Sequence, residues 1–209
     1  MEFSVSREQL LEKAHTAASV VERKQTMAIL ANILIEVDAT GAVLTGTDMD
    51  TEISTNMELV DVGSGGAITV PGKKLVEIAK ALPEGAVVQF KQDGAQMLLS
   101  SGRSKFKLST LPAPDYPRLE ARGELTTVSL ARAPLQSAIA KTQFAMAQQD
   151  VRYYLNGMLF SIGGGDFRTV ATDGHRLSLY QTPLEGISGE PVSLIVPRKA
   201  VLELARLLN

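Results

Sequence analysis

The most enzyme-like string in the sequence is Thr172-Asp173-Gly174-His175-Arg176. Asp173 and His175 stand two residues apart, so on an extended segment both side chains would point the same way. An aspartate beside a histidine can orient that histidine as a general base, as hydrolases require. However, no serine stands in a recognisable nucleophile elbow, and the similar string Thr47-Asp48 is not followed by a histidine two residues after its aspartate. A small hydrolase built on Asp173 and His175 therefore remains only as the alternative function, and no catalytic residue is assigned.

Composition excludes several other kinds of site. The chain has 209 residues, no cysteine, and only two histidines, His15 and His175. Disulfides, thiolate zinc sites, a cysteine nucleophile and a histidine-rich metal site are therefore excluded, and we expect no metal or cofactor. No apolar run approaches the roughly 20 residues of a membrane-spanning helix, and the N-terminus does not resemble a signal peptide. We expect a cytoplasmic protein without a membrane partner.

A second candidate site is the segment Gln148-Gln149-Asp150-Val151-Arg152-Tyr153-Tyr154, which holds two of the four tyrosines beside an arginine. The arginine can pair with phosphate, and the tyrosines can stack on bases or donate their hydroxyls to phosphate. The alternative is an ordinary aromatic plug over the core. The residue types alone leave both interpretations open.

Both candidate sites belong to an internal repeat with a period of 125 residues. With one inserted residue near the end, the matching segments keep the same order along the chain, which indicates a tandem duplication with domains at residues 1–122 and 123–209. The matches include Leu30, Ile33, Leu34 and Ile35 with Leu155, Met158, Leu159 and Phe160, Thr47-Asp48 with Thr172-Asp173, and Val70–Lys73 with Val196–Lys199. Nothing in the second copy corresponds to Gly85–Leu111, so we predict that the second domain lacks its last three strands.

Hydrophobic periodicity predicts an α+β fold, with two helices and several antiparallel strands in each copy. Helices are expected over residues 7–21, 71–83, 131–149 and 197–209. Strands are expected over residues 29–37, 42–47, 86–90, 97–101, 105–111, 158–162 and 167–171. Gly163-Gly164-Gly165 and Gly63–Gly66 are interpreted as hairpin loops and not as phosphate cradles.

Charge is sorted by element although the formal net charge is only −2. Helical segments taken as residues 7–24, 71–83, 131–149 and 197–209 carry +1, +2, +2 and +2, or +7 together, which leaves −9 for the rest. If the helices share one side of the molecule, that side is basic and suits a phosphate backbone. The alternative is that these cations only solvate the outer faces of amphipathic helices. The loop Glu22-Arg23-Lys24-Gln25, which corresponds to the tyrosine-bearing segment, is also basic and favours the binding interpretation.

Four long strings carry a family resemblance: Ser101–Phe106, Gln149–Gly157, Ala171–Leu177 and Val196–Lys199. They are similar to the beta subunit of bacterial DNA polymerase III, the sliding clamp, and the resemblance covers the whole chain. It implies a DNA-clamp fold of tandem domains, each with two helices on one face and antiparallel sheets on the other. In that family three domains form a subunit, and two subunits close into a homodimer ring around duplex DNA. The function implied is that of a non-enzymatic processivity factor in bacterial DNA replication.

The resemblance also implies binding sites, by matching position. Because a clamp must slide, its contacts grip the DNA backbone without reading bases; they would fall on Lys24, Lys73, Gln149, Arg152, Tyr153, Tyr154, Arg198 and Lys199. A groove for short linear peptides of DNA polymerase III and the clamp loader would use Leu155, Thr172, Gly174, His175, Arg176 and Leu177. The subunit contact would involve Phe106 and Leu108. By the repeat register the chain would supply the first domain and about two thirds of the second, without the third.

Overall fold

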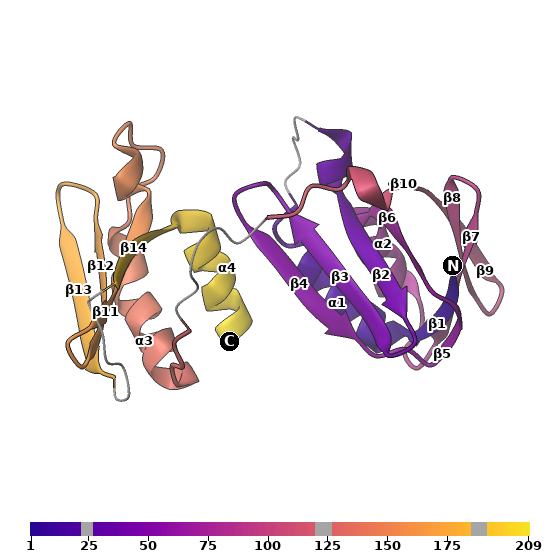
Figure 1. Cartoon of the computed structure of the whole chain (residues 1–209), viewed down its shortest axis with the longest axis horizontal. Coiled ribbons are helices and arrows are strands. Elements are labelled where there is room, and N and C mark those ends of the chain that lie inside the picture. Colours follow the sequence, from indigo (N-terminus) through magenta and orange to yellow (C-terminus); the bar gives the residue numbers. More distant parts are fainter. Residues whose placement is uncertain (22–26, 120–126, 185–191) are drawn as a thin grey trace. The chain divides into compact units, whose positions relative to one another are not determined.

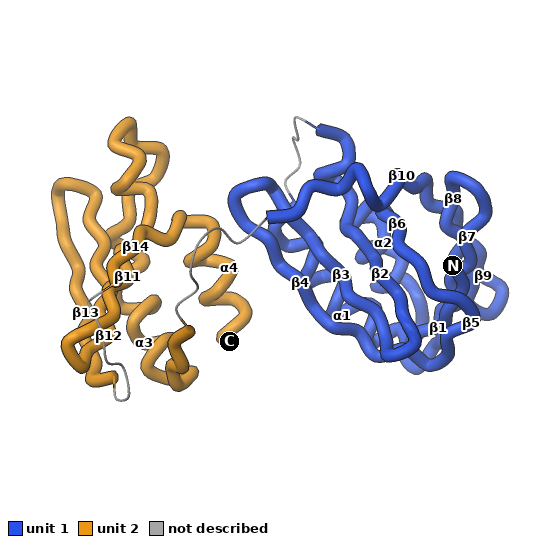
Figure 2. The backbone as a smooth tube through the Cα atoms, viewed as in Figure 1, with its two compact units in different colours: residues 1–120 blue, residues 121–209 orange. Residues whose placement is uncertain are grey.

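In the computed structural model the chain divides by its own contacts into two units, residues 1–120 and residues 121–209 (Figure 2). This division falls two residues from the boundary that the repeat predicts. The structure describes residues 1–21, 27–119, 127–184 and 192–209, so Lys24 lies outside the described residues. Within those ranges, no helix has the length and apolar character needed to cross a membrane.

Unit 1 has two antiparallel sheets with five described strands each (Figure 1). The first has the order β5-β1-β7-β8-β9, formed by Asp61–Ser64, Glu2–Ser6, Val87–Asp93, Gln96–Ser101 and Ser104–Ser109. The second has the order β10-β6-β2-β3-β4, formed by Leu111–Pro112, Gly66–Pro71, Asn32–Asp38, Gly41–Thr47 and Glu52–Met57. Buried residues of both sheets contribute to one apolar core.

Two helices, α1 (Arg7–Ala17) and α2 (Gly72–Ala81), pack on each other and complete that core. The hydroxyl of Ser6 caps α1 by accepting the backbone N–H of Gln9 at 3.3 Å. Pro71 lies one residue before α2, where its missing N–H leaves no helical hydrogen bond unmade. Gly72 allows the start of α2 to approach β2, because a Cβ there would lie 2.9 Å from Ile33 Cγ2.

Unit 2 also combines antiparallel strands with two helices, but its described strands form a single sheet of four. Its order is β13-β12-β11-β14, formed by Leu177–Pro183, Asp166–Thr172, Gly157–Gly163 and Val192–Pro197. Helices α3 (Arg132–Thr142) and α4 (Arg198–Leu208) pack on each other and share its core. In that core the rings of Phe160 and Phe167 meet edge to face, with centroids 5.5 Å apart.

Strand register repeats along with the sequence. The matching pairs are Leu34–Thr45 with Leu159–Val170, Thr47–Glu52 with Thr172–Leu177, and Asn32–Pro71 with Gly157–Pro197. The first two matches keep the 125-residue period, and the third includes the inserted residue. The predicted α+β class with antiparallel sheets is therefore confirmed.

The helices are shorter than predicted. α1 ends at Ala17, and α3 gives way after Thr142 to a 3-10 turn, Gln143–Ala145. Within the observed bounds α1 carries no net charge, whereas α2, α3 and α4 carry +2 each. The basic excess therefore lies on three helices, and whether they share one side of the molecule stays a prediction.

One of the two predicted glycine hairpins is wrong. Gly163 pairs with Asp166 across a two-residue turn, Gly164-Gly165, in which both glycines have positive φ, so this loop is a hairpin. Gly63–Gly66 is not a hairpin, because β5 pairs with β1 in one sheet while β6 pairs with β2 in the other. The segment Gly63–Gly66 therefore connects the sheet that contains β5 to the sheet that contains β6.

Candidate nucleic-acid and peptide interface

The loop before β11 presents two tyrosines to solvent. Asn156 closes this loop, since its side-chain amide donates to the carbonyl of Asp150 at 2.8 Å and its Oδ1 accepts the Asp150 N–H at 2.9 Å. The short 3-10 turn Tyr153–Leu155 buries Leu155, whereas Tyr153 is 83% and Tyr154 50% exposed. The two rings meet edge to face, with centroids 5.8 Å apart. Leu155 is therefore the buried residue of this turn, and the two tyrosine rings lie at the surface, where they can contact a ligand.

Arg152 forms a bidentate ion pair with Asp150. Its Nε and Nη2 donate to the two carboxylate oxygens at 3.0 and 2.9 Å, and the backbone N–H of Arg152 adds a third bond at 2.8 Å. These hydrogen bonds lower the pKa of Asp150 to about 2 and raise that of Arg152. A phosphate would therefore share this guanidinium with a carboxylate, which weakens the contact.

Arg198 stands beside the same loop at the start of α4. Its backbone N–H donates to the carbonyl of Asn156 at 2.9 Å, and its Nη1 donates to the carbonyl of Met146 at 3.2 Å. Both Arg198 and the following Lys199 are half-buried. The loop and the first turn of α4 thus form one basic and aromatic end of unit 2.

The structure brings six of the eight residues expected to contact DNA into one unit. These are Gln149, Arg152, Tyr153, Tyr154, Arg198 and Lys199, all within or beside the loop. Gln149 is exposed and has a φ of +57°, which is uncommon for a residue other than glycine. Lys73 is exposed in the first turn of α2 in unit 1, and Lys24 is not described.

The Asp-Gly-His-Arg string forms a tight turn between β12 and β13. Oδ1 of Asp173 accepts the backbone N–H groups of His175 and Arg176 at 3.0 Å each, and Oδ2 accepts Arg176 Nε at 3.0 Å. These bonds, led by that from the His175 backbone, lower the pKa of Asp173. The carboxylate of Asp173 therefore stabilises the turn. Its bonds go to two backbone N–H groups and to Arg176, whereas a general base would need a bond to the His175 ring.

The turn leaves an apolar and basic rim exposed. Gly174, His175, Arg176 and Leu177 are exposed, Leu177 by 65%, while Thr172 is half-buried and Leu155 is buried. Leu155 thus offers a ligand much less surface than Leu177 does. The Arg176 guanidinium also lies 5.6 Å from the ring centroid of Phe144, itself exposed. Phe144 was not among the predicted site residues, because it was expected to lie within the helix 131–149. In the structure α3 ends at Thr142, and Phe144 lies in the 3-10 turn that follows.

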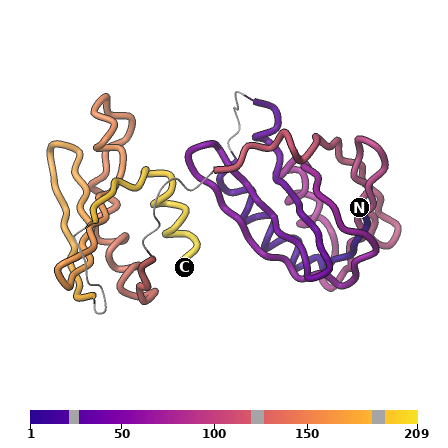
Figure 3. The backbone as a smooth tube through the Cα atoms, viewed as in Figure 1, coloured from indigo at the N-terminus to yellow at the C-terminus, as the bar shows by residue number. Residues whose placement is uncertain are grey.

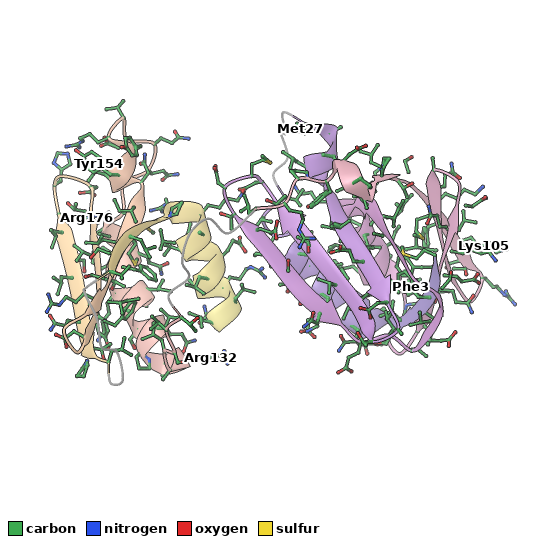
Figure 4. All side chains as sticks on the ribbon, in the orientation of Figure 1. Phe3, Met27, Lys105, Arg132, Tyr154 and Arg176 are labelled. Carbon is green, nitrogen blue, oxygen red and sulfur yellow. The ribbon has the colours of Figure 1, made fainter. Side chains whose placement is uncertain are left out.

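The loop and the turn adjoin each other. A Cβ built on Gly174 would lie 3.0 Å from Arg152 Nη2, so the guanidinium rests directly against the turn. The charge of His175 also contributes to the lowered pKa of Asp150. Tyr154 and Arg176 lie at the same end of unit 2, and Arg132 lies at the other (Figure 4). The unit-2 residues expected for DNA and those expected for peptides therefore adjoin on one surface of that unit.

The strand expected to form the subunit contact, β9, is the last strand of its described sheet. Leu108 is only 4% exposed and belongs to the core of unit 1, whereas Phe106 is half-buried and packs against that core. The expectation that the subunit contact lies around Phe106 and Leu108 stays a prediction, with Leu108 offering little surface within this unit. A partner could reach β9 through its backbone edge and its exposed residues, such as Lys105 and Lys107.

No group of three or more potential metal ligands occurs in the parts of the chain that the structure describes.

Duplicated α+β units with this strand order define a DNA-clamp fold. Residues 1–120 match the model of the DNA polymerase III beta subunit N-terminal domain, and residues 129–209 match that of its central domain. The chain therefore belongs to the DNA polymerase III beta subunit family. This is a family of sliding clamps, which are not enzymes, and the hydrolase alternative is set aside.

Known relatives agree with this assignment. The beta sliding clamps of Pseudomonas aeruginosa and of Escherichia coli K12 are each 46% identical over 209 residues, all of this chain and 57% of those proteins. A crystal structure of the P. aeruginosa clamp with a ligand has a TM-score of 0.95 at 45% identity, covering 100% of this chain and 56% of that one. The structure of Caulobacter crescentus pol III beta has a TM-score of 0.93 at 37% sequence identity. The match covers 100% of this chain and 57% of that one. The chain thus spans a little over half the length of these relatives.

Proposed function

We propose that the chain forms part of a sliding clamp, a processivity factor that encircles duplex DNA and tethers DNA polymerase III and the clamp loader through short peptides. The observation that supports this most is the continuous surface on unit 2, where an arginine and tyrosine loop adjoins an exposed apolar rim. Such a protein works where the chromosome is copied, in the bacterial cytoplasm.

The loop provides the chemistry for a sliding contact with DNA. Arg152 and Arg198 supply cations, and Tyr153 and Tyr154 supply exposed rings and hydroxyls. These groups reach phosphates and sugars without a fixed hydrogen-bond pattern that would select a base. Because Asp150 already engages Arg152, the contact of this guanidinium with a phosphate is weak, as movement along the duplex requires. Gln149, Lys199, Lys73 and Lys24 are proposed as further backbone contacts by their matching positions.

The rim provides the chemistry for peptide capture. Leu177 offers apolar surface, while His175 and Arg176 offer polar contacts at its edge. An apolar anchor on a short peptide would cover Leu177 and reach toward Leu155 and Thr172, with Gly174 allowing a close backbone approach. The opposite wall of the groove comes from the rest of the subunit in the family, so the 209 residues alone should bind such peptides weakly.

Ring assembly is proposed for a subunit of the relatives' full length. We propose clamp domains at residues 1–122 and 123–209, because the repeat register matches them and leaves Gly85–Leu111 of the first without a counterpart in the second. In the ring, the open edge of β9 with Phe106 would meet the partner subunit, as an unpaired strand edge does.

The DNA part of the proposal is tested by fluorescence anisotropy with two labelled duplexes of unrelated sequence at low ionic strength. Arg152→Ala and Arg198→Ala should weaken association equally for both duplexes and flatten the log–log salt dependence by roughly 0.9 for each lost phosphate contact. Arg168→Ala is the matched control, since Arg168 is an exposed arginine paired with Asp166 at 3.2 Å on the sheet. A loss that differs between the duplexes, or a loss as large for Arg168→Ala, would contradict backbone gripping by this loop.

A further inference from the structure

Asn156 uses each of its four polar atoms to hold the tyrosine loop of unit 2. Its side chain spans the loop, since Nδ2 donates to the Asp150 carbonyl at 2.8 Å and Oδ1 accepts the Asp150 N–H at 2.9 Å. Its backbone N–H donates to the carbonyl of Tyr153 at 3.0 Å, and its carbonyl accepts the backbone N–H of Arg198 at 2.9 Å. One residue therefore connects both ends of the loop with the start of α4.

The side-chain bonds of Asn156 require a group that donates and accepts at the same time. An amide presents a donor and an acceptor side by side, which matches one backbone carbonyl and one backbone N–H. An ionised carboxylate of the same size only accepts, so its second oxygen would face the Asp150 carbonyl without a proton between them. The chemistry of the amide, and not the size of the side chain, therefore closes the loop.

The loop is anchored on a rigid base. The strand β11 begins directly after Asn156, at Gly157. A Cβ on Gly157 would lie 2.6 Å from the Val196 carbonyl oxygen, so glycine allows β11 to start in close contact with β14. The amide of Asn156 thus transmits the fixed position of the sheet to the far end of the loop.

The middle of the loop contributes little packing of its own. It projects from one end of unit 2 (Figure 3), and Val151, Tyr153 and Tyr154 are 96%, 83% and 50% exposed. Gln149, directly before Asp150, has a φ of +57°, a conformation that a residue other than glycine seldom adopts. Without the amide bonds, conformational entropy would favour many open arrangements of these residues.

The repeat offers an internal comparison. The 3-10 turn Tyr153–Leu155 corresponds to Ala28–Leu30, within the 3-10 turn of unit 1, and the position of Asn156 is occupied there by Ala31. Unit 1 thus has the turn without the tyrosines and without the amide. The amide occurs in the copy whose turn carries the proposed DNA contacts.

We propose that Asn156 is a positioning residue for DNA binding, whose amide forms the loop before the duplex arrives, so that Arg152, Tyr153 and Tyr154 are already placed. The inference rests on the DNA contact proposed above for this loop. A preformed loop loses little conformational entropy on association, so that weak backbone contacts are enough to hold the duplex.

The first test needs no DNA and follows the loop by NMR in the 209-residue chain. At pH 7 the Asp150 N–H should exchange at least about tenfold faster in Asn156→Asp and in Asn156→Ala, because two hydrogen bonds are lost. At lower pH the introduced carboxyl group takes up a proton and can again donate and accept. Asn156→Asp should then recover the wild-type chemical shifts of Arg152–Tyr154, whereas Asn156→Ala should not.

The direction of this recovery follows from linkage. Since the closed loop accommodates only the protonated carboxyl group, the pKa of that group should be raised, and the loop should close below this pKa and open above it. Asp150 has a pKa of about 2, so its bonds to Arg152 persist through the recovery. Wild type at each pH is the reference for the charged and titratable groups around the loop, which are Asp150, Arg152, Tyr153, Tyr154, His175 and Arg198.

The second test measures association with a labelled duplex at pH 7 and low ionic strength by fluorescence anisotropy. Asn156→Ala and Asn156→Asp should both weaken association about threefold or more, because the apparent affinity falls with the population of the closed loop. Asn56→Asp is the control, since it makes the same charge change at an exposed asparagine on β4 of unit 1 and should behave as wild type.

Four results would overturn the proposal: wild-type exchange and shifts in Asn156→Asp at pH 7, no recovery of that variant at low pH while wild type stays folded, duplex binding by Asn156→Ala as tight as that of wild type, or loss of dispersed signals throughout unit 2 in both variants. The last result would assign the side chain to the stability of the whole unit. Wild type that binds no duplex would instead contradict the proposed clamp function, and this inference with it, so the two failures are distinguishable.

Discussion

Leu177→Ala tests the apolar part of the peptide rim. Leu177 is 65% exposed, so about two thirds of its surface can be covered by a peptide. Complete burial of a leucine side chain is worth about 1.5–3 kcal/mol, and two thirds of this is about 1–2 kcal/mol. At 1.4 kcal/mol for each factor of ten, the Kd should rise roughly 5- to 30-fold. Because the side chain is outside the core, the stability of the fold should stay within about 0.5 kcal/mol of wild type.

The assay is the anisotropy of a fluorescent peptide from the polymerase C-terminus, titrated with wild type and variant at concentrations suited to weak binding. Leu207→Ala is the matched control, since Leu207 is an exposed leucine (47%) on α4 of the same unit. An unchanged Kd in Leu177→Ala, or an equal loss in Leu207→Ala, would place the peptide site elsewhere.

Three further predictions concern single groups. The pKa of Asp150 is lowered to about 2 from 3.8, so the Asp150–Arg152 bonds should persist at every pH above 4 and be lost as the pH falls through 2; an NMR midpoint near 4 would contradict this. The pKa of Tyr116 is raised to about 12 from 10, so its contribution to stability is complete below pH 10 and is lost as the pH rises through 12, and an ultraviolet titration with a midpoint near 10 would refute the buried hydroxyl. Gly174→Ala should lower the free energy of unfolding by about 1–3 kcal/mol, because φ is +88° and the new Cβ would meet Arg152 Nη2 at 3.0 Å. Gly164→Ala, at φ +63° with open space around it, should cost less, and equal losses in thermal denaturation would rule out the arginine contact.

The repeat made much of the fold predictable. Strands such as Asn32–Asp38 and Gly157–Gly163 carry matching apolar residues, and their register follows the same period. The helix ends were less predictable, because the alanines near Ala17 continue the apolar pattern beyond the last helical turn. The hairpin predicted at Gly63–Gly66 was wrong because a glycine-rich turn between two strands does not show which sheet each strand joins.

The local structure of the candidate site was predictable at the level of segments and less so at the level of side chains. The tyrosine loop and the Asp-Gly turn could be identified from residue types. That Asp173 caps its own turn, that Asp150 engages Arg152 and that Phe144 lies under Arg176 all depend on the three-dimensional path of the backbone. The family resemblance supplied positions but not burial, as Leu108 shows.

We propose that unit 2 meets duplex DNA through its loop and the start of α4 without reading sequence. Chemical-shift mapping of the labelled chain with two short duplexes of unrelated sequence tests this most directly. We expect the same amides to shift with both duplexes, around Arg152–Tyr154 and Arg198. Shifts that differ between the duplexes, or that lie away from these residues, would contradict it.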